Sequence, residues 1–440
     1  MRSNERSNKL MLIMSLYLCT LFIYKDFGVR MILGYALLGA AFLFAMLQRP
    51  YLKMSKDIVI YILIVLTVLL SFAGPGARLD RDTIAYAVLM VVSVLYVLSI
   101  RMSLDEYEKI ERIIYVAAAV FAVLVVISRL NRDIYLHTVY KLLTSDAQEL
   151  AHDDLWHGYS CPIGGDETYH NYMFMIAAMF SLGNIVVRKK DWKKHYFIAL
   201  FFVFASFLTG RRGEFLALFL ICAGVGIYIL PRKQRRRVLW ITLLIALIAV
   251  PFIPRLLGST LMSRFAHTVE QAKSGSDFVG GRMELWGEAI RIFLLHPVFG
   301  IGWGGYANFV TEEFRAAHGD VFNVHNIYLQ FLAETGIVGT LIIVSSLLAL
   351  LFMTLHQALA IKNNNAVDDT LKKMNLISLG IQGYYLLMGF LDPCFMKYYF
   401  WIFYAFAFSL QQFVRKSRSE MPGQMSAPLL KERKNEDLFG

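Results

Sequence analysis

Two adjacent arginines occupy a short turn between two apolar stretches, in the sequence Thr209-Gly210-Arg211-Arg212-Gly213-Glu214. Guanidinium groups bind phosphate oxygens through paired hydrogen bonds, and flanking glycines allow a ligand to approach the backbone. A helix that begins near Glu214 would add backbone N–H donors. Arg211 and Arg212 are therefore candidates for binding a phosphate. The alternative is that they extend to the membrane surface and pair with Glu214.

A histidine opens a second segment of interest, which runs from His325-Asn326 to Gly339. If one continuous helix covers residues 325–339, about 100° per residue puts His325 on the same face as Gly336 and Gly339. Small residues permit close helix packing, so we expect this face to lie against a neighbour, with His325 at its outer end. A neutral imidazole there is a candidate general base for a hydroxyl. The alternative is a histidine that only caps the start of the helix.

A third arginine, Arg282, opens a stretch with apolar residues at helical spacing. We predict a helix from Arg282 to about Leu295, which ends at His296-Pro297 and is followed by a glycine-rich turn. The pattern is typical of a helix that lies on the outer face of a membrane. Arg282 is either a further anion contact or a solvated charge beside Glu284 and Glu288.

The segment 129–170 contains acidic residues and histidines. Its closest group, His152, Asp153, Asp154 and His157, lacks the spacing of a strong metal site. We therefore expect a solvated loop, with no metal and no other cofactor.

The elements that must position these residues are apolar helices. Of the 440 residues, 57% are hydrophobic and 18% are charged, whereas soluble proteins have roughly 45–50% and about 25%. Several apolar runs approach the length of about 20 residues that crosses a bilayer. This composition argues against a soluble enzyme, a disordered protein and a nucleic-acid-binding domain, and it indicates a polytopic membrane protein.

Basic clusters follow every second apolar run, as the positive-inside rule requires. The net charge of +11 is then an orientation signal, and no nucleic-acid partner is needed to explain it. We predict an all-α protein with about twelve transmembrane helices and both termini in the cytoplasm. The predicted helices cover residues 10–24, 31–47, 58–73, 83–100, 113–128, 171–187, 196–209, 214–230, 238–254, 326–355, 376–391 and 398–413.

Only two of the outer segments exceed hairpin length, residues 129–170 and 255–325. We assign both to one transmembrane domain, 1–413, in which the longer loop precedes the tenth helix. The polar tail 414–440 is predicted to be disordered and cytoplasmic.

The four cysteines do not form a disulfide scaffold. Cys19 and Cys222 lie in apolar runs and are expected in the core. Cys161 and Cys394 both fall on the outer side, and only their distance decides whether they form a bridge.

Three segments, in order along the chain, resemble the O-antigen ligase and O-antigen polymerase superfamily of bacterial envelope polysaccharide enzymes. The ligase signature is His, then Asn, Ser or Gln, nine residues, Gly, two residues, and Gly, Thr or Tyr; His325-Asn326, Gly336 and Gly339 meet it. A second signature, Arg-x-x-x-Leu, is present at residues 212–216. The stretch 282–302 is similar to the helix and turn of the family's large loop.

The resemblance implies an inverting, metal-independent glycosyltransferase with a GT-C-like membrane fold. It implies a donor glycan on undecaprenyl diphosphate, with Arg212, Arg282 and Arg211 as diphosphate ligands and His325 as the base that activates an acceptor hydroxyl. Its further partners would be a glycan or glycolipid acceptor, the lipid bilayer and a chain-length regulator. The other motif residues, which are expected to support helix packing, are Asn326, Gly336 and Gly339.

The motifs separate two reactions poorly. Polymerases join one lipid-linked repeat to another, whereas ligases move the finished polymer to a lipid A core sugar, and both need the same anion site and base. We favour a polymerase of O-antigen, capsule or exopolysaccharide repeats, because nothing marks a lipid A partner, and we keep the ligase as the alternative. Either enzyme is expected in the bacterial inner membrane, with its active site on the extracytoplasmic side.

A transporter or flippase for lipid-linked glycan is the alternative from another class. It predicts charged residues along a path through the membrane, and the apolar runs are nearly free of them.

Overall fold

The computed structural model describes most of the chain between residues 56 and 419. All the regular elements in this part of the chain are helices, and no strand occurs among the described residues. The predicted all-α class is therefore confirmed. The described residues are 56–79, 90–91, 93–94, 104–156, 159–160, 162, 168–230, 236–237, 240, 282–318, 323–396 and 398–419.

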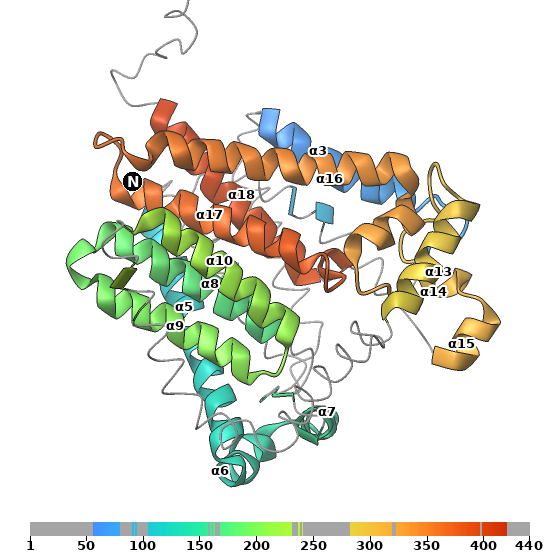
Figure 1. The fold of residues 1–440 in the computed structure, drawn as a ribbon, viewed down its shortest axis with the longest axis horizontal. Helices are drawn as coiled ribbons and strands as arrows, with labels where there is room; N and C mark the ends of the chain where they lie inside the picture. Colours follow the sequence, from blue (N-terminus) through green and yellow to red (C-terminus); the bar gives the residue numbers. More distant parts are fainter. Residues whose placement is uncertain are drawn as a thin grey trace, which may run out of the picture.

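Long apolar helices form the bundle, and they lie close to the predicted spans (Figure 1). Four stretches of the described residues are long and apolar enough to cross a membrane: Tyr107–Leu130, His170–Val187, Arg212–Ile229 and Ile327–Lys362. The bundle helices are α3 (Lys56–Ser71), α5 (Leu104–Leu130), α8 (Thr168–Val187), α9 (Trp192–Leu208), α10 (Arg212–Ile229), α16 (Ile327–Lys362), α17 (Asp369–Met388) and α18 (Tyr398–Ser419).

Several predicted helices fall on other parts of the chain. The spans 10–24 and 31–47, and nearly all of 83–100 and 238–254, lie outside the described residues. The count of twelve helices and the GT-C-like arrangement therefore stay predictions. At the C-terminus, α18 continues to Ser419, past the predicted start of the tail, and the remainder of the tail also lies outside the described residues.

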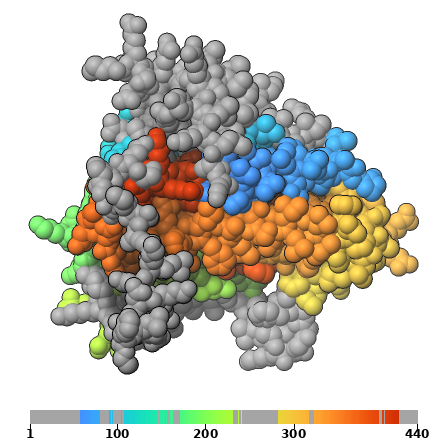
Figure 2. Space-filling model, turned by 90° about the horizontal axis from the view of Figure 1, so that it is seen from above, coloured from blue at the N-terminus to red at the C-terminus, as the bar shows by residue number. Residues whose placement is uncertain are grey.

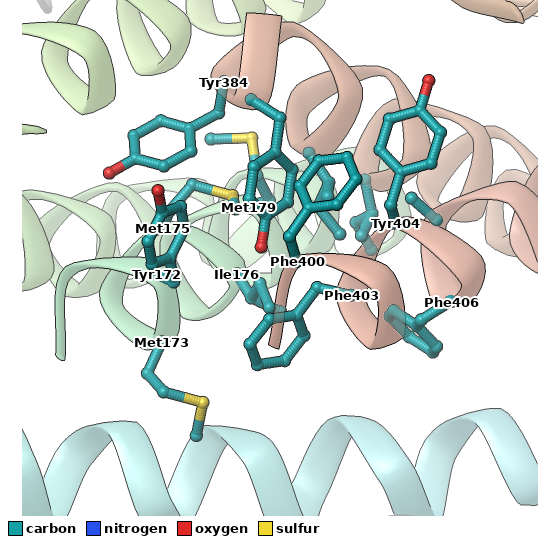
Figure 3. Packing of buried hydrophobic residues seen from close by; sticks show 14 of the residues in the cluster. Tyr172, Met173, Met175, Ile176, Met179, Tyr384, Phe400, Phe403, Tyr404 and Phe406 are labelled. Atoms are coloured by element: carbon teal, nitrogen blue, oxygen red, sulfur yellow. The ribbon is translucent and has the colours of Figure 1, made fainter. Parts of the chain in front are cut away.

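Helix α8 lies at the centre of the bundle and packs against α5, α9, α10 and α17. Its residues are buried along almost its whole length, because apolar side chains surround it on every face. The core that joins it to α17 and α18 is rich in aromatic rings and methionines (Figure 3). Within this core the Tyr172 ring of α8 lies 5.1 Å from that of Tyr385 and 5.5 Å from that of Tyr384, measured between centroids.

A second group of helices lies at one end of α16. Figures 1 and 2 show α3 running along α16, with α13 (Arg282–Leu295) beside the end at which α16 begins. The helix predicted from Arg282 to about Leu295 is thus confirmed. Two short helices follow, α14 (Tyr306–Phe309) and α15 (Glu312–His318). The group has a small core of its own, formed by Ala289, Ile292, Ile301, Tyr306, Val310, Val324 and Ala333.

The segment predicted as a solvated loop, 129–170, contains short helices. They are α6 (Arg132–His137), the 3₁₀ turn η1 (Val139–Leu142) and α7 (Ser145–Trp156). Asn131 begins α6 as an N-cap, since its side chain accepts a hydrogen bond of 3.1 Å from the Ile134 N–H.

The cysteines fit the sequence analysis where they can be followed. Cys222 lies in α10 and packs against the main core as a partly buried residue. Cys394 is fully buried, and its thiol lies 3.6 Å from the Tyr385 carbonyl oxygen. Cys161 lies outside the described residues, so the bridge to Cys394 stays an open question.

Candidate active site

The turn that carries the paired arginines is formed by a glycine. Helix α9 ends at Leu208, and Gly210 adopts φ of +81°, a conformation that favours glycine. Arg211 then occupies the N-cap position of α10, and Arg212 is its first residue. The predicted helix start is therefore confirmed, and both arginines stand where the free N–H groups of a helix end would add to their positive charge.

Buried polar groups of Ser160, Asn171, Thr209 and Glu214, which we call the polar frame, are hydrogen-bonded to one another at this turn. The Asn171 side-chain N–H donates to the Thr209 hydroxyl at 3.1 Å and to the Glu214 carboxylate. The Thr209 carbonyl accepts a hydrogen bond of 3.0 Å from the Ser160 N–H. Burying so many polar groups is tolerated only when they bond one another, so the frame fixes the position of the turn. Sequence analysis missed Asn171 as a member of this site, because it is distant in sequence from the turn and uncharged, and it gave no role to Thr209 although that residue begins the arginine segment.

The structure brings the three predicted arginines together. The Arg211 guanidinium lies 4.4 Å from the centroid of the Tyr159 ring, a cation–π contact. Arg282 lies within electrostatic reach of Arg211 and Arg212, and its pKa is lowered from the ordinary value, first by its burial and further by these two charges. Positive charges gathered in this way are suited to the binding of an anion.

A carboxylate opposes this concentration of positive charge. Asp392 raises the pKa of Arg282, so its carboxylate lies within electrostatic reach of this guanidinium, and Tyr159 acts in the same direction. Nothing in the local sequence connects Asp392 to residues 282 or 212. Its role emerges from the fold alone.

The turn that directly follows α17 connects the arginine cluster with the start of α16. The Gly389 carbonyl accepts a hydrogen bond of 2.8 Å from the Ile327 N–H. On its other side, Leu391 packs on Gly213 so closely that a Cβ on this glycine would lie 2.9 Å from Leu391 Cδ1. Because Gly213 follows Arg212 and Ile327 comes two residues after His325, the turn places both predicted site segments at the same end of the bundle.

His325 lies just before α16 and not within it. Its φ of +52° is outside the helical range, and its backbone N–H lies 3.3 Å from the Asn323 side-chain oxygen. Asn326 caps the helix, because its side-chain oxygen accepts bonds of 3.0 and 3.2 Å from the N–H groups of Tyr328 and Leu329. The capping role considered for His325 therefore belongs to its neighbour.

A glycine break interrupts α16 where the sequence predicted a continuous helix. Gly336 has φ of +63° and ψ of −172°, and the backbone of the turn after α13 enters the gap. Backbone groups of α16 on both sides of Gly336 therefore form hydrogen bonds with this turn, where a continuous helix would bond to itself. The bonds run from Ile301 N–H to Ala333 C=O (3.0 Å), from Gly302 N–H to Glu334 C=O (2.8 Å), from Ile337 N–H to Pro297 C=O (2.8 Å) and from Val338 N–H to Val298 C=O (3.2 Å).

The predicted common face of His325, Gly336 and Gly339 is therefore wrong. It assumed an unbroken rotation of about 100° per residue, and the non-helical conformations of His325 and Gly336 invalidate it. Gly336 does permit a close approach, but the neighbour is the backbone of Val298: a Cβ would lie 2.3 Å from its carbonyl oxygen. Gly339 faces α3, where a Cβ would lie 3.4 Å from Thr67 Cγ2.

A buried glutamate, which sequence analysis missed, holds the same turn from the other side. Glu334 is fully buried, and its carboxylate accepts bonds from the N–H groups of Gly304 (2.9 Å) and Tyr306 (3.3 Å). Gln330 donates to it at 3.0 Å. A charged residue inside an apolar helix is a signal in itself, and here it fixes the turn between α13 and α14 to α16.

Helix α13 presents an ion pair on one side and an apolar surface on another. The Glu288 carboxylate accepts hydrogen bonds from Nε and Nη2 of Arg291, at 2.8 and 2.7 Å, and from the Thr311 N–H at 2.9 Å. Glu288 is therefore engaged within its own group of helices, so of the two acidic neighbours considered for a solvated Arg282, Glu284 and Glu288, the second loses support. The exposed apolar residues of this helix are Met283, Ile290, Leu294 and Leu295, as expected for a helix on a membrane surface.

In the part of the chain that the structure describes, apolar helices thus form a bundle, and at one end of it three arginines lie near a helix break that a loop fills. Residues 197–344 match the family described as O-antigen ligase, a range that includes all three arginines, His325 and both motif glycines. The match confirms the predicted resemblance to the O-antigen ligase and polymerase superfamily, and it supports a glycosyltransferase-like enzyme of ligase or polymerase type in a membrane. No curated protein matches the chain.

Proposed function

We propose that this protein transfers a glycan from undecaprenyl diphosphate to a sugar hydroxyl, and that it is a repeat-unit polymerase. The observation that carries the proposal is the meeting of Arg211, Arg212 and Arg282 at the end of the bundle where His325 precedes α16. A lipid diphosphate and a hydroxyl nucleophile are the reactants that this combination suits.

The arginines would act on the leaving group. When the bond between the anomeric carbon and the diphosphate breaks, the diphosphate gains negative charge. Guanidiniums fixed by the buried frame below the turn stabilise that charge more in the transition state than in the bound donor, which accelerates the reaction. They supply positive charge of the kind that a divalent cation supplies in other transferases, so the proposal includes no metal.

His325 would act on the nucleophile. Its imidazole takes the proton of the acceptor hydroxyl while the oxygen forms the new bond to the anomeric carbon, opposite the departing diphosphate. A direct attack of this kind inverts the configuration at that carbon. His325 has a positive φ and comes before the Asn326 cap, so it is not part of α16 and its position is not set by the helical repeat.

The proposed site faces the extracytoplasmic side of the bacterial inner membrane. The basic segments after α8 and α10 are at the other ends of these helices, which supports this orientation by the positive-inside rule.

The second candidate is an O-antigen ligase, because that is the description of the family whose pattern residues 197–344 match. The two are separated with purified protein and a lipid-linked repeat unit. A polymerase yields longer lipid-linked glycans from this single substrate. Product that forms only after a lipid A core acceptor is added would reject the polymerase in favour of the ligase, and no product with either would reject the transferase.

A further inference from the structure

A basic cavity lies at the opposite end of the bundle from the arginine cluster. It has a volume of about 550 Å³, within the range of roughly 300–1,000 Å³ that holds small ligands. It lies where α8, α10 and α16 end and α17 begins. The arginine cluster, in contrast, lies where α10 and α16 begin and α17 ends, so the two sites face opposite sides of the membrane.

Three lysines contribute to the lining of this cavity, against one acidic residue. Lys189 and Lys372 both bind Asp369, at 3.0 and 2.9 Å. The Lys362 ammonium lies 4.1 Å from the centroid of the Tyr228 ring, which is itself fixed by a 2.6 Å hydrogen bond from its hydroxyl to the Ala358 carbonyl. Three ammonium groups and one carboxylate leave a net positive lining, and Asp369 draws two of the lysines to one point.

Apart from Asn363 and Asn365, the rest of the lining is apolar and aromatic. Ile185, Leu230 and Ile361 line it at the ends of the helices, and Trp192 stands at the start of α9. Tryptophan and tyrosine beside lysine, at the ends of membrane helices, are typical of the level of lipid headgroups. An inorganic ion would not need such apolar walls, whereas a lipid presents both a charged phosphate and hydrocarbon.

We propose that this cavity binds the headgroup of an acidic phospholipid, with Lys362 and Lys372 contacting its phosphate and the aliphatic walls covering the start of its acyl chains. If the arginine cluster faces outward, as proposed above, the bound lipid belongs to the cytoplasmic leaflet. The binding itself does not depend on glycan transfer, so either proposal can fail without the other.

The test measures lipid binding to the purified full-length protein in detergent, with fluorescent phosphatidylglycerol and fluorescent phosphatidylcholine as probes. We expect phosphatidylglycerol to bind and phosphatidylcholine not to bind. K362Q and K372Q should each raise the Kd for phosphatidylglycerol about fivefold, since a lysine near a lipid surface contributes on the order of 1 kcal/mol. D369N should lower it severalfold, because it removes the competing carboxylate.

The matched control is K190Q/K193Q, which removes two exposed lysines that are close in sequence to Lys189 but do not line the cavity. This variant should bind as the unaltered protein does. A gain of affinity in D369N cannot result from misfolding, so it keeps the test valid if a lysine variant is unstable. Equal binding of both lipids, an effect of K190Q/K193Q as large as that of K362Q and K372Q, or displacement of the lipid by inorganic phosphate at equal concentration would each overturn the proposal.

Discussion

The two parts of the candidate active site are built from different materials. Charged side chains form the arginine cluster, with guanidiniums from α10 and α13, Asp392 opposite them and a polar frame beneath. Backbone groups form most of the neighbouring region, where the turn after α13 fills the break in α16 and glycines such as Gly300 and Gly336 let the two backbones touch. The first part should be sensitive to charge and the second to volume.

This difference reflects the work that each part does. An anion-binding site needs charged groups within hydrogen-bonding distance of the ligand, and small shifts in their positions are tolerated. Residues of such a site therefore tolerate conservative exchange better than loss of charge. A helix break that is satisfied by another segment's backbone needs contacts at van der Waals distance, and an added carbon atom has nowhere to go. Substitutions in the two regions should therefore separate activity from folding.

The largest effect is expected for Gly336→Val. A side chain there would require φ of +63°, and its Cβ would lie 2.3 Å from the Val298 carbonyl oxygen. We expect a loss of more than about 4 kcal/mol in the free energy of unfolding, enough to prevent recovery of folded protein. Thermal unfolding of the purified protein in detergent measures it.

Gly287→Val is the matched control for this substitution. Gly287 lies in α13 with no atom within 4 Å of a Cβ built on it, so this variant should unfold at the same temperature as the unaltered protein to within a few degrees. Equal stability of the Gly336→Val and Gly287→Val variants would show that the backbone contact at the break is not needed for folding.

Arg212→Gln tests the arginine cluster, which is the other region in this comparison. Loss of one donor that stabilises a developing negative charge typically lowers a rate by about 10²–10³, or roughly 2.7–4 kcal/mol. We expect a fall of this size in the rate of glycan transfer, with thermal unfolding nearly unchanged. Arg129→Gln removes a nearby guanidinium that bonds the Leu208 carbonyl at 2.9 Å, and it should affect stability more than the rate; the reverse pattern for the two arginines would contradict the assignment.

Glu288→Gln should produce an intermediate effect that is confined to α13–α15. Hydrogen bonds from Arg291 and from the Thr311 N–H lower the pKa of Glu288, so its contribution to stability is present above the unfolded pKa of about 4.3 and is lost as the pH falls through the folded pKa. We expect faster amide exchange in residues 306–318 at neutral pH, by roughly 1–3 kcal/mol of local stability. At a pH below the lowered folded pKa of Glu288 the unaltered protein should exchange as fast as the variant; a difference that persists at such a pH would show that charge is not the cause.

Asp392→Asn should have the smallest effect, and its sign is informative. Asp392 partly neutralises the cluster around Arg282, so its removal should tighten binding of the diphosphate donor about fivefold, or about 1 kcal/mol. Titration of the donor into the purified variant measures the Kd. Weaker binding would mean that Asp392 positions Arg282, and that its charge opposes the ligand less than we infer.

The sequence predicted the elements of the site better than the contacts between them. The arginine turn and the helix from residue 282 follow local rules, namely apolar runs, helix starts and a Pro stop, and both are present. The break at Gly336 follows no local rule, because it exists only where residues 297–302 supply the missing hydrogen bonds. The roles of Asp392, Asn171 and Glu334 likewise depend on contacts with segments that are far away in the chain. The charge of Glu334 within an apolar run was nevertheless visible in the sequence.

The most direct test of the account compares donor binding with glycan transfer in two variants, His325→Ala and Arg212→Gln/Arg282→Gln, using purified protein and a lipid-diphosphate-linked repeat. Histidine acts on the acceptor in this account, so His325→Ala should bind the donor with nearly the original Kd while transfer falls by about 10²–10⁴. The double arginine variant should lose donor binding itself. A His325→Ala protein that transfers glycan at the original rate once saturated with donor, or arginine variants that bind the donor normally, would contradict a site made jointly by the arginine cluster and His325.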